Sequence, residues 1–437
     1  MFSSFLNRNY DRAIWALALP ALGSLAADPL VSLVDTAFVG RLGVEALGAL
    51  GVNTAIFSLS FFIFNFLAYG TTPMIARSLG KNDKAQAGRI IMQAFTLATL
   101  LGVAALLVLE LFAPYLLSIM GASAELQSSA LVYLRIRALA APAVLFITAG
   151  NGVFRGFQNT RTPLMISLLL NGINIVLDPL FIFGFGWGLA GAALATALAQ
   201  WVGALSFIGL IFFQQREKLG LELSLPNFSE LRPFLKIGWE LFLRTLSLSL
   251  TFTFATSVAT RLGVTQVAAH QVASQIWLLL ALTIDALAIA AQALVAKYAQ
   301  ENRQEAKAVA DRLLFLGFIA GLFFALFFFV FQGFLPHFFT NEPEVTRLVL
   351  KIFPFIILTQ PLNAVVFVWD GVFIGAEDFA FLAFAMMVSA LISAVVLVLV
   401  VPLGWGLIGV WWGISTLMIA RVLGLGWRYQ KLFRPKP

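Results

Sequence analysis

Residues 379–402 have the sequence FAFLAFAMMVSALISAVVLVLVVP, which contains 24 residues and no charged side chain. A helix of about 20 apolar residues is long enough to cross the roughly 30 Å hydrocarbon core of a bilayer. Similar runs recur along the whole chain, in which 60% of the 437 residues are hydrophobic and 11% are charged. The mean hydropathy is +0.93, whereas about 25% of the residues of a soluble domain are charged. The chain is therefore predicted to fold within a membrane.

These runs predict helices and not the strands of a barrel. Backbone polar groups need partners in lipid, so only helices and closed barrels span a membrane. Barrel strands alternate apolar and polar residues, whereas these runs are continuously apolar. We predict an all-α polytopic membrane protein with 12 transmembrane helices near residues 13–39, 49–78, 88–116, 130–153, 163–184, 189–213, 233–260, 267–297, 309–334, 346–373, 379–402 and 407–428.

The basic residues are distributed unevenly between the two sides of this division. Of 28 Lys and Arg residues, 21 fall in one set of loops and the two tails, six fall on the other side, and Arg244 lies within a span. Because cytoplasmic loops collect Lys and Arg, both termini are predicted to face the cytoplasm of a bacterial inner, or plasma, membrane. The basic residues are scattered among short loops, so no nucleic-acid partner is expected.

The second half of the chain repeats the first. Residues 41–52, RLGVEALGALGV, align without gaps with residues 261–272, RLGVTQVAAHQV, at an offset of 220. Further on, Gly186-Trp187-Gly188-Leu189 matches Gly404-Trp405-Gly406-Leu407. The repeat needs the apolar N-terminal run as its first helix, so we expect this run to be retained although it resembles a signal peptide.

An even number of six spans per copy gives both copies the same orientation in the membrane. The duplication therefore predicts two pseudo-symmetric six-helix lobes around a central cavity, an architecture that suits alternating access. The polar stretch 214–232 is predicted to be a cytoplasmic linker between the lobes 1–213 and 233–437.

Polar groups inside the spans are the functional candidates, because ionisable side chains are expensive in lipid and usually face a cavity. Asp35 lies in the first span, and Asp178 lies in the fifth, four and seven residues after Asn174 and Asn171 on the same helix face. Two polar residues one turn apart in the sixth span can complete this cluster. The candidate cation-coupling or substrate residues are Asp35, Asn171, Asn174, Asp178, Thr196 and Gln200.

The two acids belong to the first copy alone. Asp35 aligns with Ala255, and Asp178 falls opposite Leu397 or its neighbour, which favours a specialised task over packing. Loss of water favours the neutral form of a carboxylate, so a buried acid suits proton exchange. Carboxylates among carboxamides and a hydroxyl suit Na⁺ equally well. The alternative is that Asp35 pairs with Arg41 at the outer end of the span.

The remaining polar residues give weaker signals. Asp28 is a candidate for a helix kink, and Asp285 and Asp370 are candidates for cavity residues of the second lobe or for interfacial groups. Glu240 and Arg244 are spaced for a local ion pair. The chain has two histidines and no cysteine, so a convergent catalytic set is missing and no enzyme activity is expected. No cofactor is expected either. The expected partners are a small organic substrate and membrane lipid, and the chain is expected to be a monomer.

Four stretches resemble the multidrug and toxic compound extrusion family, and most closely its DinF branch. They are LVDTAFVGRLG at 33–43, PMIARSLG at 73–80, GNGVFRGFQNTRT at 150–162 and NIVLDP at 174–179. The resemblance implies export of drugs or metabolites in exchange for H⁺ or Na⁺ through a cavity between two lobes. It also implies that Asp35, Asn174, Asp178 and Thr196 form the coupling cluster of the N-terminal lobe.

The chain departs from the NorM branch of that family, whose span-10 acid falls at Asn363. This departure favours H⁺ coupling in the first lobe, with Na⁺ as the alternative ion at the four cluster residues. A second alternative is a flippase for lipid-linked precursors, which belongs to the same superfamily. Such a protein is expected to carry a more cationic cavity, and Arg244 is the one cation that the sequence places clearly within a span.

Overall fold

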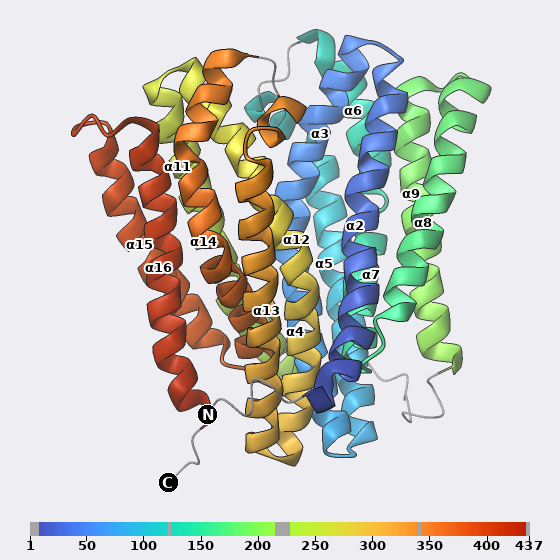
Figure 1. The fold of residues 1–437 in the computed structure, drawn as a ribbon. Helices are drawn as coiled ribbons and strands as arrows, with labels where there is room; N and C mark the ends of the chain where they lie inside the picture. Colours follow the sequence, from blue (N-terminus) through green and yellow to red (C-terminus); the bar gives the residue numbers. More distant parts are fainter. Residues whose placement is uncertain (1–7, 121–123, 215–227, 340–341, 434–437) are drawn as a thin grey trace. The chain divides into compact units, whose positions relative to one another are not determined.

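The computed structural model of the protein describes residues 8–120, 124–214, 228–339 and 342–433, and no strand occurs among them. Figure 1 shows long helices in both halves of the chain. Among the described residues, 11 helices are long and apolar enough to cross a membrane. A bent pair, Leu126–Ala138 with Ala141–Gly156, raises the number to 12 when it is counted as one span. The predicted all-α membrane fold is confirmed.

The chain forms two compact units by its internal contacts. The first-half unit contains Leu19–Gly238, and the second-half unit contains Met1–Ala18 together with Trp239–Pro437. The first turns of the N-terminal helix therefore pack with second-half helices, and Asp11 accepts hydrogen bonds of 2.7 and 2.8 Å from Arg312. The lobe limits remain a prediction, and most of the predicted linker lies outside the described residues.

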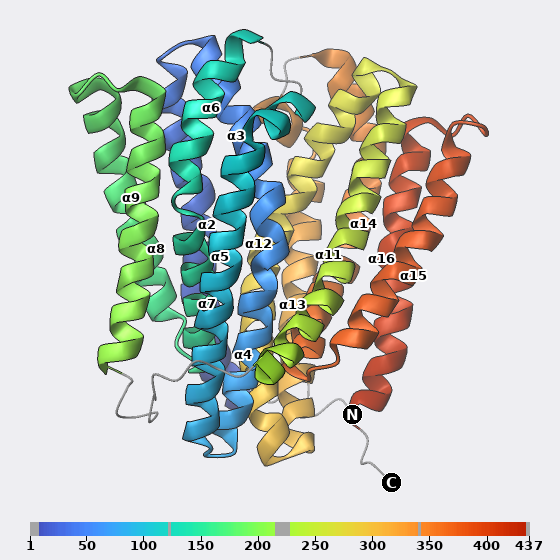
Figure 2. The ribbon, with the colours of Figure 1, turned by 180° about the vertical axis from the view of Figure 1, so that it is seen from behind.

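The first-half unit shares two helices with the second-half unit, α2 at its start and α11 (Phe228–Leu262) at its end. Its helix α5 begins after Asp83, whose carboxylate caps the helix by accepting a 2.9 Å hydrogen bond from the backbone N–H of Gln86. Helices α4, α5 and α7 pack on one another (Figure 2). The elements are α2 (Asp11–Gly40), α3 (Val44–Phe62), η2 (Ile63–Asn65), α4 (Phe66–Gly80), α5 (Lys84–Ile119), α6 (Ala124–Ala138), α7 (Ala141–Gly156), α8 (Arg161–Pro179), η3 (Leu180–Gly184), α9 (Gly188–Gly209) and η4 (Leu210–Gln214).

Helices α6 and α7 form the bent pair, with an angle of 47° between them. Pro142 stands in the first turn of α7. Proline has no backbone N–H and fits the first turn of a helix better than its interior, so the chain breaks here and does not continue α6. The break falls inside the predicted span 130–153, and both of its helices contribute side chains to the cavity described below.

The second-half unit contains the end of the chain, where α15 and α16 lie side by side in Figures 1 and 2. Helices α12, α13 and α14 enclose its apolar core. The elements are η1 (Arg8–Tyr10), α11 (Phe228–Leu262), α12 (Val264–Glu301), α13 (Arg303–Phe331), η5 (Leu335–Phe338), α14 (Pro343–Gly375), α15 (Phe379–Val400) and α16 (Gly406–Leu432).

The duplication is visible in the backbone of a turn that precedes the last helix of each half. Gly186 and Gly188 have φ values of 71° and 54°, and the matching Gly404 and Gly406 have φ values of 65° and 59°. Glycine adopts positive φ at no steric cost, whereas other residues are strained there. The repeated Gly-Trp-Gly sequence therefore encodes the same turn twice.

A close helix crossing is repeated as well. A Cβ atom added to Gly152 of α7 would lie 2.8 Å from Cα of Ala68 in α4. The equivalent Gly371 of α14 lies equally tightly against Ala288 of α12, and Ala68 and Ala288 are related by the offset of 220. Glycine at such a crossing lets two helix backbones approach closely within a membrane.

Replacing Gly152 with alanine is expected to lower the free energy of unfolding by about 1–3 kcal/mol, because the new methyl group must push α7 away from α4. Gly172→Ala is the matched control, since an added Cβ at this helical position meets nothing within 4 Å. Thermal unfolding of both purified variants in detergent measures the difference. Equal stability of the two variants would show that the crossing is not tightly packed.

Candidate functional site

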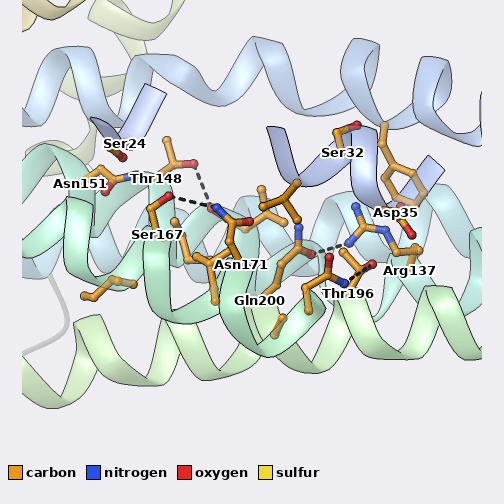
Figure 3. Close-up of a pocket in the computed structure, with 18 of the residues that line it drawn as sticks. Ser24, Ser32, Asp35, Arg137, Thr148, Asn151, Ser167, Asn171, Thr196 and Gln200 are labelled. Carbon is orange, nitrogen blue, oxygen red and sulfur yellow. Dashed lines mark hydrogen bonds between the residues drawn. The ribbon is translucent and has the colours of Figure 1, made fainter. Parts of the chain in front are cut away.

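The first-half unit contains a cavity of about 480 Å³. Helices α2, α3, α6, α7, α8 and α9 enclose it, and Figure 3 shows its polar side chains. Most of its lining side chains carry a hydroxyl, carboxamide or charged group. They are Ser24, Ser32, Asp35, Thr54, Ser58, Asn65, Tyr133, Arg137, Thr148, Asn151, Ser167, Asn171, Asn174, Thr196 and Gln200.

Asn174 is the centre of a hydrogen-bonded group at one end of this cavity. Its Nδ2 atom donates to Oδ1 of Asp178 over 3.1 Å and to Oγ1 of Thr196 over 3.2 Å. The Thr196 hydroxyl donates in turn to the carbonyl oxygen of Ala192 over 2.9 Å. The structure therefore brings these three predicted residues together from α8 and α9.

Asp35 reaches the same group from α2, and its carboxyl group interacts with that of Asp178. Asp178 is fully buried behind Asn174. One oxygen atom of each acid, Oδ1 of Asp35 and Oδ2 of Asp178, is buried without a hydrogen-bond partner. Two acids that are 143 residues apart in the sequence thus form a carboxyl pair with spare acceptor capacity.

Arg137 of α6 lies beside this pair and was not predicted to do so. Its guanidinium donates a 2.7 Å hydrogen bond to Oε1 of Gln200 and lies 5.0 Å from the centre of the Phe57 ring. It interacts electrostatically with both Asp35 and Asp178, and Figure 3 shows it next to Asp35. The sequence analysis counted Arg137 among the six basic residues of the non-cytoplasmic side and gave it no role in the site.

Arg137 stands in the last turn of α6, which continues to Ala138 before the chain bends. A hydropathy pattern does not show whether an arginine near the edge of an apolar run turns into the protein or away from it. The available signal was Tyr133, which precedes Arg137 by one helical turn and also lines the cavity. Arg137 is the charged partner that the structure gives Asp35, in place of the Arg41 that the alternative interpretation suggested.

The other two predicted residues line the cavity in different places. Asn171 donates a 3.3 Å hydrogen bond to the Ser167 hydroxyl. Gln200 binds the guanidinium group of Arg137, and among the described residues no hydrogen bond joins it to Asn174. Thr196 instead binds Asn174, which also binds the Asp178 carboxyl group.

The chain loosens directly after Asp178, as Pro179 predicts. Helix α8 ends at Pro179 and continues as the five-residue π-helical segment Leu180–Gly184. Such segments occur often at functional sites, because the widened turn shifts the side chains before it. The Asp178 carboxyl group is therefore positioned at the last regular turn of α8.

The comparisons with known proteins identify the family. The family model MatE matches residues 20–180 and 241–399, which together make up most of the chain. The chain belongs to the MATE family. It is 36% identical to Protein DETOXIFICATION 44, chloroplastic, of Arabidopsis thaliana over 95% of this chain and 81% of that protein. It is 30% identical to DNA damage-inducible protein F of Escherichia coli, over 96% of this chain and 93% of that one.

A solved structure agrees with these relatives. The crystal structure of a MATE protein in the bent conformation superposes with a TM-score of 0.89 and 27% sequence identity, and it covers 97% of this chain and 96% of its own. The resemblance that the sequence indicated is confirmed. This MATE-family chain is an integral multi-pass membrane protein of the multidrug and toxin efflux type, and the members of its family are transporters and not enzymes.

In the second-half unit of this MATE transporter, an ion cluster stands where the repeat places the cavity residues of the first-half unit. Ser24 and Asn151 line the cavity, and their equivalents at offsets of 220 and 219 are Arg244 and Asp370. Asp370 accepts hydrogen bonds from Arg244 and, over 2.6 Å, from Arg421 of α16. The Arg421 side chain is 1% exposed and that of Asp370 is 6% exposed.

This cluster gives Arg244 a partner that the sequence analysis did not name. The spacing had indicated a local pair with Glu240, and the structure shows that Arg244 binds Asp370 of α14. Arg421, which the sequence analysis counted among the 21 basic residues of the cytoplasmic side, is buried in the unit. The sequence had placed Arg244 alone clearly within a span. The structure shows that Arg137 and Arg421 also lie among the packed helices.

The two histidines and Asp285 are not among the residues that line the cavity. The buried His270 lies 3.2 Å from the Thr256 hydroxyl, and His337 is exposed. Asp285 lies in α12 of the second-half unit, and the side chain of Asp28 lies outside the described residues. Within the described ranges, no group of three or more His, Cys, Asp or Glu side chains has the arrangement of a metal site.

Proposed function

We propose that this chain exports small organic compounds in exchange for protons, with Asp35 and Asp178 as the proton-binding pair. The observations that support this proposal are the interaction of the two carboxyl groups and the position of Asp35 in the lining of a cavity that also holds Arg137. Two carboxylates in contact repel each other when both are ionised, and one proton between them removes the repulsion. The pair is therefore suited to bind and release a proton.

Arg137 favours H⁺ over Na⁺ as the coupling ion. Its positive charge balances one carboxylate of the pair and is always present, because a guanidinium does not lose its proton in proteins. A Na⁺ ion at the group of Asp35, Asn174, Asp178 and Thr196 would add a second positive charge beside this guanidinium. A proton neutralises a carboxyl group directly and needs no coordination shell of oxygen atoms.

Exchange follows when substrate and proton compete for the same carboxyl groups. A cationic group of the substrate binds the pair only after its proton has left, so each ligand shifts the equilibrium away from the form that the other prefers. Alternating access of the cavity to the two sides of the membrane then converts this competition into antiport. No cofactor takes part in this scheme, and the chain acts as a monomer.

We further propose that the chain lies in a bacterial inner, or plasma, membrane with both termini in the cytoplasm. The excess of Lys and Arg in one set of loops and the tails supports this orientation. Arg137 and Arg421, which the structure places within helix bundles, come from opposite sides of that count. Removing them leaves the direction of the bias unchanged.

The flippase alternative receives no support from the cavity. A site for a pyrophosphate group is expected to carry several uncompensated cations. Among the described residues that line the cavity, Arg137 is accompanied by Asp35, and Asp178 lies directly behind Asn174. The two carboxyl groups outnumber the one guanidinium, so these residues do not form an anion site.

Transport by purified protein in proteoliposomes tests the choice of ion. We expect a pH gradient to drive movement of the fluorescent cation ethidium by the wild type and a Na⁺ gradient to have no effect. Arg137→Gln is expected to acquire Na⁺-dependent transport or Na⁺ binding, because it removes the fixed positive charge beside the carboxyl pair. Ethidium fluorescence and ²²Na⁺ retention are the measurements.

Arg135→Gln is the matched control, because it removes an arginine of the same helix whose side chain is 53% exposed and lies 3.7 Å from Glu110. This variant is expected to behave like the wild type under both gradients. Wild-type transport driven by Na⁺ would overturn the proposed proton coupling. If Arg137→Gln binds no Na⁺, Arg137 is not the residue that excludes this ion.

A further inference from the structure

Helices α15 and α16 form an apolar groove of about 420 Å³ on the second-half unit. Small residues such as Ala385, Ala420 and Gly424 lie along it, and larger ones such as Phe384 and Leu423 line it as well. The side chains of Phe384 and Leu423 are exposed. In a membrane-spanning chain, such a groove must be covered by lipid or by another helix.

The length of the groove matches one leaflet of a bilayer. It runs from Thr416 to Trp427 on α16 and from Phe381 to Ile392 on α15. Eleven residues of helix rise by about 16 Å, which is half of the roughly 30 Å hydrocarbon thickness. A second apolar groove, with Trp405 and Trp412 in its lining, continues beyond Thr416. The two grooves together match the two leaflets.

The end of the groove at Trp427 has the composition of a membrane interface. The Nζ atom of Lys431, one turn beyond Trp427, lies 3.8 Å from the centre of the Trp427 ring. Arg428 lies 5.2 Å from the centre of the Phe381 ring and forms a 2.8 Å ion pair with Asp378. Tryptophan and basic residues gather where the hydrocarbon meets the headgroups.

The positive charge of Lys431 favours a negatively charged occupant of the groove. Lys431 is exposed, and none of the ion pairs found among the described residues involves it. A second copy of this chain, placed with the same orientation against this face, would bring a second Lys431 to the same interface. The phosphate of a lipid instead brings a negative charge to the place where the groove ends.

We propose that the groove between α15 and α16 binds one acyl chain of an anionic phospholipid whose phosphate group contacts Lys431 at the end marked by Trp427. The acyl chain fills the groove down to Thr416. The site lies wholly within the second-half unit and does not depend on the coupling ion or on the substrate of the first-half cavity.

Native mass spectrometry of the full-length protein in detergent tests this proposal. Phosphatidylglycerol and phosphatidylcholine are titrated separately, and we expect one phosphatidylglycerol to bind per chain more tightly than phosphatidylcholine. Lys431→Gln is expected to weaken phosphatidylglycerol binding about fivefold, the effect of one basic residue at an anionic surface, and to weaken phosphatidylcholine binding less, because the choline group balances the charge of its phosphate. Ala420→Phe is expected to weaken both lipids by filling the groove.

Lys81→Gln is the matched control, because Lys81 is an exposed lysine at the end of α4 in the other unit. Equal binding of the two lipids by the wild type would overturn the proposal. So would a Lys431→Gln variant that binds phosphatidylglycerol as tightly as Lys81→Gln does. Dimers that lose their contact in Ala420→Phe would show that a second copy covers the groove.

Discussion

Asp35→Asn is expected to abolish ethidium transport driven by a pH gradient while leaving the fold intact. Asparagine has nearly the shape of a protonated aspartic acid, so the contact with Asp178 can be kept as a hydrogen bond. It cannot release a proton, however, and the competition between proton and substrate is lost. The loss should reduce transport to the level of empty vesicles, measured as ethidium fluorescence in proteoliposomes.

Glu45→Gln provides the matched control for that measurement. Glu45 is an exposed acid of α3 in the same unit, and it accepts a 3.0 Å hydrogen bond from Ser129. Removing its charge is expected to leave transport unchanged, because it lies outside the lining of the cavity. Proton-driven transport at the wild-type rate by Asp35→Asn would refute the role of the carboxyl pair.

The cluster of polar residues around the two carboxyl groups illustrates what can be predicted from this sequence. Asn171, Asn174 and Asp178 recur at helical spacing within an apolar run, so their common face follows from helix geometry alone. Thr196 was a candidate from its spacing with Gln200 in the sixth span, whereas the approach of Asp35 to these residues could be anticipated only through the family resemblance. The structure brings Asp35, Asp178 and Thr196 into this group directly.

Arginines near the ends of apolar runs were harder to predict. A long side chain at a helix end can turn toward lipid headgroups or into the protein, and hydropathy does not distinguish the two directions. Arg137 and Arg421 both turn inward, toward Gln200 and Asp370 respectively. Their partners lie 63 and 51 residues away, so no local pattern could reveal them.

The same positions of the repeat thus serve different purposes in the two units. Ser24 and Asn151 leave space for a cavity in the first-half unit. Their equivalents Arg244 and Asp370 are joined by ion pairs in the second-half unit. A buried carboxylate between two guanidinium groups is costly to assemble but far more costly to break. The second-half unit therefore has a fixed contact among α11, α14 and α16 at the positions where the first-half unit has its polar cavity.

Asp370→Asn is expected to lower the free energy of unfolding by about 3–5 kcal/mol, because it leaves Arg421 buried without its negative partner. The repeat itself shows that asparagine fits the backbone at this position, since the equivalent residue is Asn151. The loss would therefore report the missing charge and not a steric clash. Thermal unfolding of the purified variant in detergent, followed by circular dichroism, measures it.

Asp378→Asn separates this effect from the general loss of an ion pair. Asp378 binds Arg428 over 2.8 Å, but the Arg428 side chain is 38% exposed and can turn to water or to lipid headgroups. An exposed pair of this kind contributes about 0–1 kcal/mol, so this variant should unfold close to the wild type. If both variants unfold alike, the buried cluster does not hold α11, α14 and α16 together, and the positive charge of Arg421 must be balanced in some other way.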